Sequence, residues 1–193
     1  MPAPRTREDP MQLPRRSMLA LAPQLAVLAV ATVGTAANLP SRSVQARFAT
    51  TAGYRAHPSR TDAVAYDRRW VPVGSWVRVT ELANDLGGVT VRLAVRGLAP
   101  DASYRALVHV SRCGAVPSSA GAPFTNTPAS GQYDANELPL AFRTGPSGAA
   151  SAAIVRDWGI GTGQRAGSVV IDARGGAPVA CVTVPFARLN PGW

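Results

Sequence analysis

The chain from Ala63 onward consists of short apolar runs separated by turn residues. The run VTVRLAVR at 89–96 alternates strictly, with valine or leucine at every odd position and a polar residue or alanine at every even position. This period of two is that of a strand with one buried face. The apolar runs predict strands at 63–70, 74–82, 89–98, 104–110, 138–142, 148–155, 168–173 and 179–186. Short strands at this spacing, with glycine- and proline-containing turns between them, indicate an all-β sandwich or barrel.

Residues 1–37 have the pattern of an export signal. The basic pair Arg15-Arg16 precedes an apolar stretch that ends on small residues, in the order of n-region, h-region and cleavage site. Cleavage after Ala36 or Ala37 fits this pattern, and cleavage after Ala46 fits it as well. The arginine pair resembles that of a twin-arginine signal. We therefore expect an extracytoplasmic protein, secreted or in the cell envelope; an uncleaved membrane anchor is the alternative.

The rest of the chain divides into three parts. Residues 38–62 show no sustained hydrophobic period, and they predict a linker or flexible arm. Residues 63–186 hold all the predicted strands and are expected to form the β-sandwich domain. Residues 187–193 are expected to form a C-terminal tail.

Composition supports a packed domain but identifies no partner. Hydrophobic residues make up 46% of the chain and charged residues 16%, which excludes disorder throughout. All 20 basic residues are arginine, and the formal net charge is +9. Basic proteins can favour anionic surfaces, but these arginines are scattered, and no series of aromatic residues for base stacking accompanies them. We expect no nucleic-acid partner, and membrane contact only through an uncleaved N-terminal segment.

One of the two histidines lies on a predicted strand. On 104–110 the even-numbered residues form the apolar face, and Leu107 and His109 project from the opposite face. His109 is therefore a candidate site residue; a surface histidine with one hydrogen bond is the alternative. His57, in the predicted linker, is expected in an exposed loop.

The two cysteines are candidates for a disulfide. Cys113 follows the strand at 104–110, and Cys181 lies in the last strand. Exported proteins with an even number of cysteines commonly pair them. Two free, buried thiols are the alternative.

Four blocks of sequence carry a resemblance to a known family. They are GLAPDASYRALVHVSRCGAVPSSAGAPF, NELPLAF, GSVVIDA and PVACVTVPF, in this order. The chain resembles the copper/zinc superoxide dismutases over roughly residues 63–186, and is especially similar to their secreted bacterial branch. The resemblance implies a Greek-key β-sandwich or barrel of the copper/zinc superoxide dismutase type with one intramolecular disulfide.

The resemblance also implies where metal ligands would lie, and here the chain departs from the family. The family has histidines at four copper positions, which fall here on Leu107, His109, Pro123 and Asp172. Only His109 is a histidine. The family's zinc loop corresponds to TNTPASGQYDAN, which has no histidine and only Asp134 as a carboxylate. The arginine that guides anions in the family falls on Pro178.

The small number of metal-binding side chains also argues against a copper site, independently of the resemblance. Copper that changes oxidation state while bound needs several imidazole or soft ligands in one geometry. Beyond the export signal the chain has two histidines, two cysteines and no methionine. Nor does it contain the GxSxG or HExxH motifs or a phosphate-binding glycine loop. We therefore expect no catalytic residue and no cofactor.

These observations predict a superoxide-dismutase-like domain without dismutase activity, acting as an extracytoplasmic binding or structural module with an unknown partner. One alternative is a divergent copper/zinc superoxide dismutase that completes its site with non-standard ligands. Another is a weak metal-binding protein, in which His109 and Asp172 would hold a divalent ion such as copper or zinc. The oligomeric state stays open.

Overall fold

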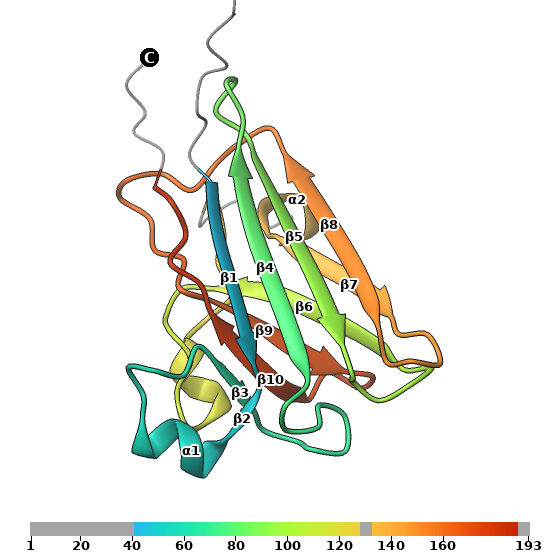
Figure 1. The fold of residues 1–193 in the computed structure, drawn as a ribbon. Coiled ribbons are helices and arrows are strands. Elements are labelled where there is room, and N and C mark those ends of the chain that lie inside the picture. The colour runs from blue at the N-terminus through green and yellow to red at the C-terminus, as the bar shows by residue number, and fades with distance from the viewer. Residues whose placement is uncertain (1–40, 128–132, 189–193) are drawn as a thin grey trace, which may run out of the picture. The chain divides into compact units, whose positions relative to one another are not determined.

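The computed structural model describes residues 41–127 and 133–188, and it is nearly all β in that part of the chain (Figure 1). The first sheet, sheet A, is antiparallel and has the order β1-β4-β5-β8. Its strands are β1 (Ser41–Arg47), β4 (Trp76–Ala83), β5 (Val89–Arg96) and β8 (Ala150–Arg156).

The second sheet, sheet B, has the order β2-β3-β10-β9-β6-β7, and only the β2–β3 pair is parallel. Its strands are β2 (Ala49–Thr50), β3 (Ala63–Ala65), β6 (Ser103–His109), β7 (Pro139–Arg143), β9 (Ser168–Ala173) and β10 (Pro178–Thr183). Three short helices lie between strands: α1 (Thr51–Ala56), η1 (Pro117–Ala120) and α2 (Tyr133–Asn136).

The main core lies between the two sheets and follows the alternation in the sequence. On β5, the residues from Val89 to Val95 at odd positions are at most 1% exposed, and they pack against residues of sheet B such as Ala106 and Ile171. Each run that the sequence predicts as a strand overlaps one of the observed strands, with bounds that differ by one residue at one end in several of them. The prediction of an all-β, two-sheet domain is therefore confirmed.

The segment predicted as a linker is largely part of the fold. Within 38–62, β1 pairs with β4 from Ser41 opposite Leu82 to Arg47 opposite Trp76. The flexible-arm prediction is wrong here because β1 is an edge strand. Its inward side carries Arg42 as well as Val44 and Ala46, so the hydrophobic period is hidden.

The helix α1 then closes the connection from β2 to β3. The Thr50 hydroxyl accepts the Gly53 N–H at 2.9 Å, the usual arrangement at a helix N-terminus. His57 is exposed just beyond α1, as expected.

Cys113 and Cys181 form the predicted disulfide, with Cα atoms 5.7 Å apart and a sequence separation of 68. The bond joins the loop after β6 to the middle of β10. A loop of this length contributes about 4 kcal/mol of stability in the loop-entropy account. The alternative of two free thiols is excluded.

Of the predictions about the two ends of the chain, the described residues bear only on the start of the C-terminal tail. Residues 1–37, which are predicted to be an export signal, and residues 189–193 lie outside them. Ala187, at the start of the predicted tail, is buried, and its N–H donates to Glu81 Oε2 at 2.6 Å. In the described ranges, no helix is long and apolar enough to cross a membrane.

Candidate functional site

The predicted ligand positions lie on the face of sheet B that points away from the main core, called the outer face below. Strands β6 and β9 are antiparallel neighbours, with His109 opposite Ser168, Leu107 opposite Val170, and Arg105 opposite Asp172. Side chains alternate along each strand, so all six share the outer face. Asp172 is diagonal to Leu107, a separation of roughly 7–8 Å between such positions.

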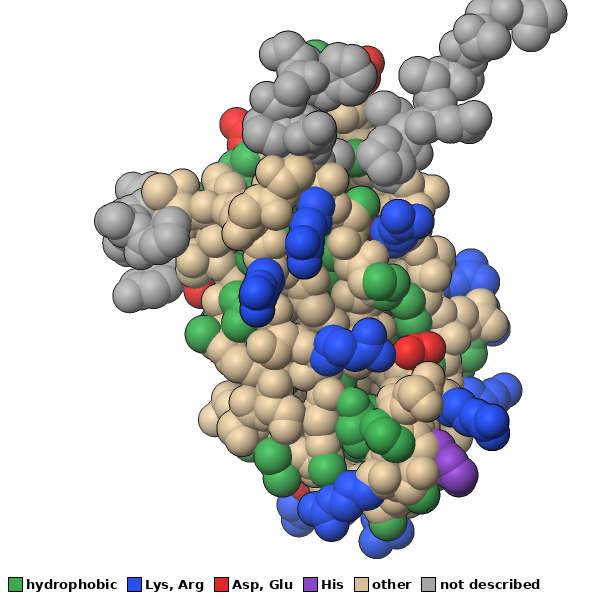
Figure 2. All heavy atoms as spheres, turned by 90° about the vertical axis from the view of Figure 1, so that its left-hand side faces the viewer, with side chains coloured by type: hydrophobic (Ala, Val, Ile, Leu, Met, Phe, Trp, Pro, Cys, Tyr) green, Lys and Arg blue, Asp and Glu red, His purple; other side chains and the backbone are tan. Residues whose placement is uncertain are grey.

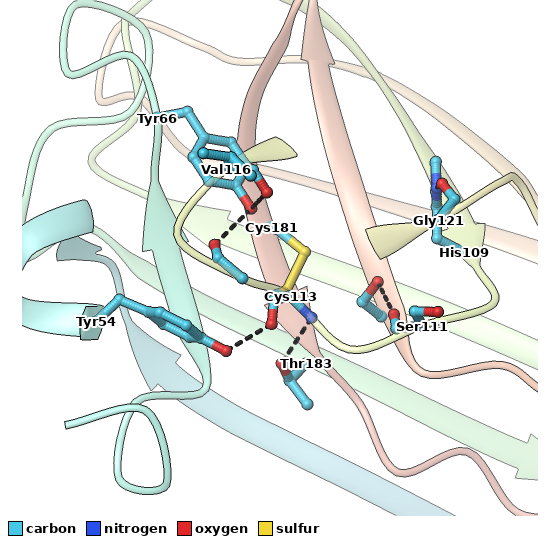
Figure 3. The surroundings of a disulfide bond; sticks show 11 residues. Tyr54, Tyr66, His109, Ser111, Cys113, Val116, Gly121, Cys181 and Thr183 are labelled. Carbon is cyan, nitrogen blue, oxygen red and sulfur yellow. Dashed lines mark hydrogen bonds between the residues drawn. A yellow bond between two sulfur atoms is a disulfide. The ribbon is translucent and has the colours of Figure 1, made fainter. Parts of the chain in front are cut away.

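His109 is held by the loop that follows its strand. Its Nδ1 lies 2.8 Å from the Gly121 carbonyl oxygen (Figure 3), and its backbone forms a bridge with Pro123. A carbonyl can only accept, so in this bond Nδ1 carries the proton. The neutral imidazole then has its lone pair on Nε2, the arrangement that metal-binding histidines use. The fold thus orients His109 as a ligand, although one histidine does not make a site.

Asp172 is a half-buried carboxylate on the same face as His109, four residues away along the β6–β9 register. Burial raises the pKa of Asp172, and the charges of His109 and Arg105 oppose this rise. Its backbone neighbour on the other side is Pro178 of β10, the position at which the resemblance would place a guiding arginine. The predicted pair His109 and Asp172 therefore lies within electrostatic range on one face.

The other two ligand positions offer no donor atom to a metal. Leu107 is 9% exposed and packs as an apolar side chain, and Pro123 is exposed. Within 41–127 and 133–188, no three His, Cys, Asp or Glu side chains are grouped so that they could hold a metal ion. The side chain of Asp134 lies outside the described residues.

A basic side chain lies close to the ligand positions. Arg105 is opposite Asp172 across the β6–β9 pair, and its Nη2 lies 3.7 Å from Glu137 Oε2. Glu137 is 6% exposed. The outer face therefore carries a guanidinium between two carboxylates, and Arg105 offsets part of the negative charge that would attract a divalent cation to Asp172.

The part of the outer face around the disulfide has more hydrogen bonds than the part that holds the ligand positions. The Tyr54 hydroxyl donates to the Cys113 carbonyl at 2.5 Å, and the Tyr66 hydroxyl donates to the Gly114 carbonyl at 3.0 Å (Figure 3). The Cys113 N–H donates to the Thr183 hydroxyl at 3.3 Å. Burial raises the pKa of Tyr66 to about 12, so its hydroxyl stays a donor at any physiological pH.

A small apolar cluster fills the space around this disulfide, formed by Tyr54, Val64, Cys113, Ala120, Val170 and Cys181. The loop also packs tightly on itself: a Cβ at Gly114 would lie 2.1 Å from Ser119 Oγ. Sequence reasoning missed Tyr54 because it lies in the predicted linker. No local signal identifies it, since its partner is 59 residues away.

Glu81 is a second residue that the sequence analysis missed. It lies on the inward side of β4, between Val79 and Ala83, and is 2% exposed. Burial raises the pKa of Glu81 to about 7, against the lowering effects of the Ala187 N–H and the Arg42 charge. The signal was present, since this position continues the apolar phase of the strand.

No protein-family model matches this chain, and no curated protein matches it significantly.

Proposed function

We propose that this chain is an extracytoplasmic β-sandwich related to the copper/zinc superoxide dismutases that does not dismutate superoxide and acts as a binding or structural module. The strand order supports the relationship. β5 and β8 are neighbours in sheet A, while β6 and β7 between them in sequence pair in sheet B. Strands exchanged between two sheets in this way are typical of Greek-key sandwiches. The disulfide between the loop after β6 and the last strand agrees with the same family.

The ligand set carries the functional part of the proposal. The positions that correspond to copper ligands lie on the outer face, with Asp172 four residues along the β6–β9 register from His109, and three of the four hold leucine, proline and aspartate. A redox copper site needs several imidazole or soft ligands, and His109 is the one imidazole available there. Arg105 adds a positive charge beside Asp172. Both features disfavour tight copper binding.

A weak metal-binding protein, or a divergent dismutase with non-standard ligands, is the second candidate. One observation favours it: His109 has Nε2 oriented as an acceptor, and the Asp172 carboxylate is within electrostatic range. Imidazole and carboxylate together suit zinc or copper. Two ligands from one chain leave most of the coordination sphere to water or a partner.

The pairing of β1 favours two of the three predicted cleavage sites. Cleavage after Ala46 would remove nearly all of β1, which pairs with β4 along its length. Cleavage after Ala36 or Ala37 keeps β1 intact. We expect N-terminal sequencing of the exported protein to give a mature chain that begins at residue 37 or 38.

Superoxide turnover tests the functional proposal. The protein is loaded with excess copper and zinc, desalted, and compared with free copper at the residual concentration. We expect superoxide removal no faster than that of the free copper. Catalytic turnover that survives a chelator would contradict the proposal and favour the divergent dismutase.

A further inference from the structure

Four arginines converge on one groove outside the predicted metal-ligand positions. The groove has a volume of about 1210 Å³, and its lining includes Arg42, Arg112, Arg165 and Arg188. They come from four separate segments: β1, the loop after β6, the segment before β9 and the segment after β10. All four side chains are exposed. Figure 2 shows a face of the molecule on which basic side chains outnumber acidic ones.

Backbone contacts fix the walls that carry two of these arginines. The Gly167 N–H donates to the His109 carbonyl at 2.8 Å, and the Ser168 hydroxyl donates to the Ser111 carbonyl at 2.7 Å. A Cβ at Gly167 would lie 2.8 Å from the Ser111 carbonyl carbon, so only glycine allows the two segments to approach this closely. Arg112 and Arg165, next to these contacts, are therefore held on neighbouring walls.

The segments that carry the other two arginines both lie next to the buried Glu81. The Ala187 N–H donates to Glu81 Oε2 at 2.6 Å, which anchors the segment that carries Arg188. Glu81 lies opposite Arg42 across the β1–β4 pair. Glu81 is buried and does not line the groove.

The charge in the groove is only partly balanced, because Glu81 lies opposite Arg42 but no acidic residue in the lining faces the other three arginines. None of the described residues that line it is acidic, and a guanidinium stays protonated at any physiological pH. Bringing four such charges together is unfavourable unless an anion joins them. Guanidinium groups bind phosphate oxygens through paired N–H donors, so several arginines on facing walls suit a ligand with several phosphate groups.

We propose that this groove binds a soluble anion with several linked phosphate groups, that is, an oligophosphate. The concave shape favours such a ligand over a membrane, because a flat layer of lipid headgroups cannot enter a groove while a narrow chain can. The proposal deepens the proposed function as a binding module, on which it rests, by naming a ligand class. It depends on no metal ligand.

Titration calorimetry with inorganic tripolyphosphate tests the proposal on the full chain at physiological salt. The double variant Arg112→Gln/Arg165→Gln should bind at least tenfold more weakly than wild type. A second pair, Arg42→Gln/Arg188→Gln, should weaken binding similarly, and guards against a local folding defect in the first. The matched control is Arg92→Gln/Arg174→Gln, which removes the same charge from exposed residues outside the groove. Its affinity should stay within twofold of wild type.

Three results would overturn the proposal. One is no heat of binding from wild type, and another is equal weakening in the control and groove variants, which would indicate non-specific attraction. The third is arginine-dependent sedimentation with phosphatidylglycerol vesicles but no tripolyphosphate binding, which would assign the groove to a membrane surface. If the groove does not bind tripolyphosphate, the non-dismutase proposal still stands, because copper binding and superoxide turnover test it separately.

Discussion

The outer face of sheet B has two adjoining regions that differ in how complete they are: the surroundings of the disulfide on β3 and β10, called the disulfide end, and the ligand positions on β6 and β9, called the ligand end. At the disulfide end, a covalent bond, two tyrosine hydroxyls and a small apolar cluster hold the loop after β6. At the ligand end, the same loop brings Pro123 next to His109, but three of the four positions lack an imidazole. The loop is thus stabilised by contacts that involve no metal. A loop held in this way needs no metal ion to keep its shape.

Removing the disulfide should reduce the unfolding free energy more than any other change proposed here. The variant Cys113→Ala/Cys181→Ala should lose about 4 kcal/mol of unfolding free energy, because the unfolded chain regains the entropy of the open loop. Urea unfolding measures the loss. Intact mass checks the wild-type bond, since reduction adds about 2 Da, one hydrogen per sulfur. An unchanged unfolding midpoint would show that the tyrosine bonds and packing hold the loop alone.

Tyr54→Phe should be the next largest change. It leaves the buried Cys113 carbonyl without its donor, which costs about 2 kcal/mol. Tyr66→Phe is the matched control: its hydroxyl bond is only partly buried, so water can replace it and the loss should be smaller. Urea unfolding measures both losses of unfolding free energy. Equal losses in the two variants would contradict the claim that the Tyr54 bond is the more buried of the two.

Restoring imidazoles should convert the ligand end into a metal site. In Leu107→His/Asp172→His, the two new side chains join His109 on the outer face, and copper affinity should rise at least tenfold, or about 1.4 kcal/mol. Competition with a chromogenic chelator measures the gain. Leu107→His/Arg174→His is the control, with one histidine misplaced on an exposed turn. Unchanged affinity in a folded 107/172 variant would show that these positions do not converge.

Asp172→Asn should have the smallest effect, visible in its pH dependence. Burial raises the pKa of Asp172 in the folded protein, so the folded state binds this proton more tightly than the unfolded chain. The contribution to stability is present below pH about 4 and is lost as pH rises through the raised pKa. The Tm of the variant, compared with that of wild type, should therefore rise between pH 4 and 7. A gap that stays constant with pH would contradict the assigned shift.

The sequence predicted what depends on local alternation. Strand β5 has one apolar face, and its burial follows the pattern residue by residue, whereas on β6 the outward Leu107 is buried as well. β1 was missed because an edge strand with Arg42 on its inward side shows no such pattern. Glu81 could have been noticed as a charged residue in the apolar phase of β4.

The candidate sites were less accessible to sequence reasoning. The side of the strand on which Leu107 and His109 lie follows from alternation, but their proximity to Asp172 depends on the β6–β9 register. The arginine groove could not be predicted, because its four arginines come from segments that only the folded chain brings together. The spacing of these arginines along the sequence does not indicate that they lie together.

Copper analysis of the exported wild-type protein tests the central claim most directly. The protein is recovered from cells grown with added copper and zinc, desalted, and measured by mass spectrometry of the elements together with protein concentration. The account predicts well under one copper per chain, because the ligand end of the outer face has one imidazole where copper needs several. One chelator-resistant copper per chain would contradict it, and would show that the replaced positions still form a metal site.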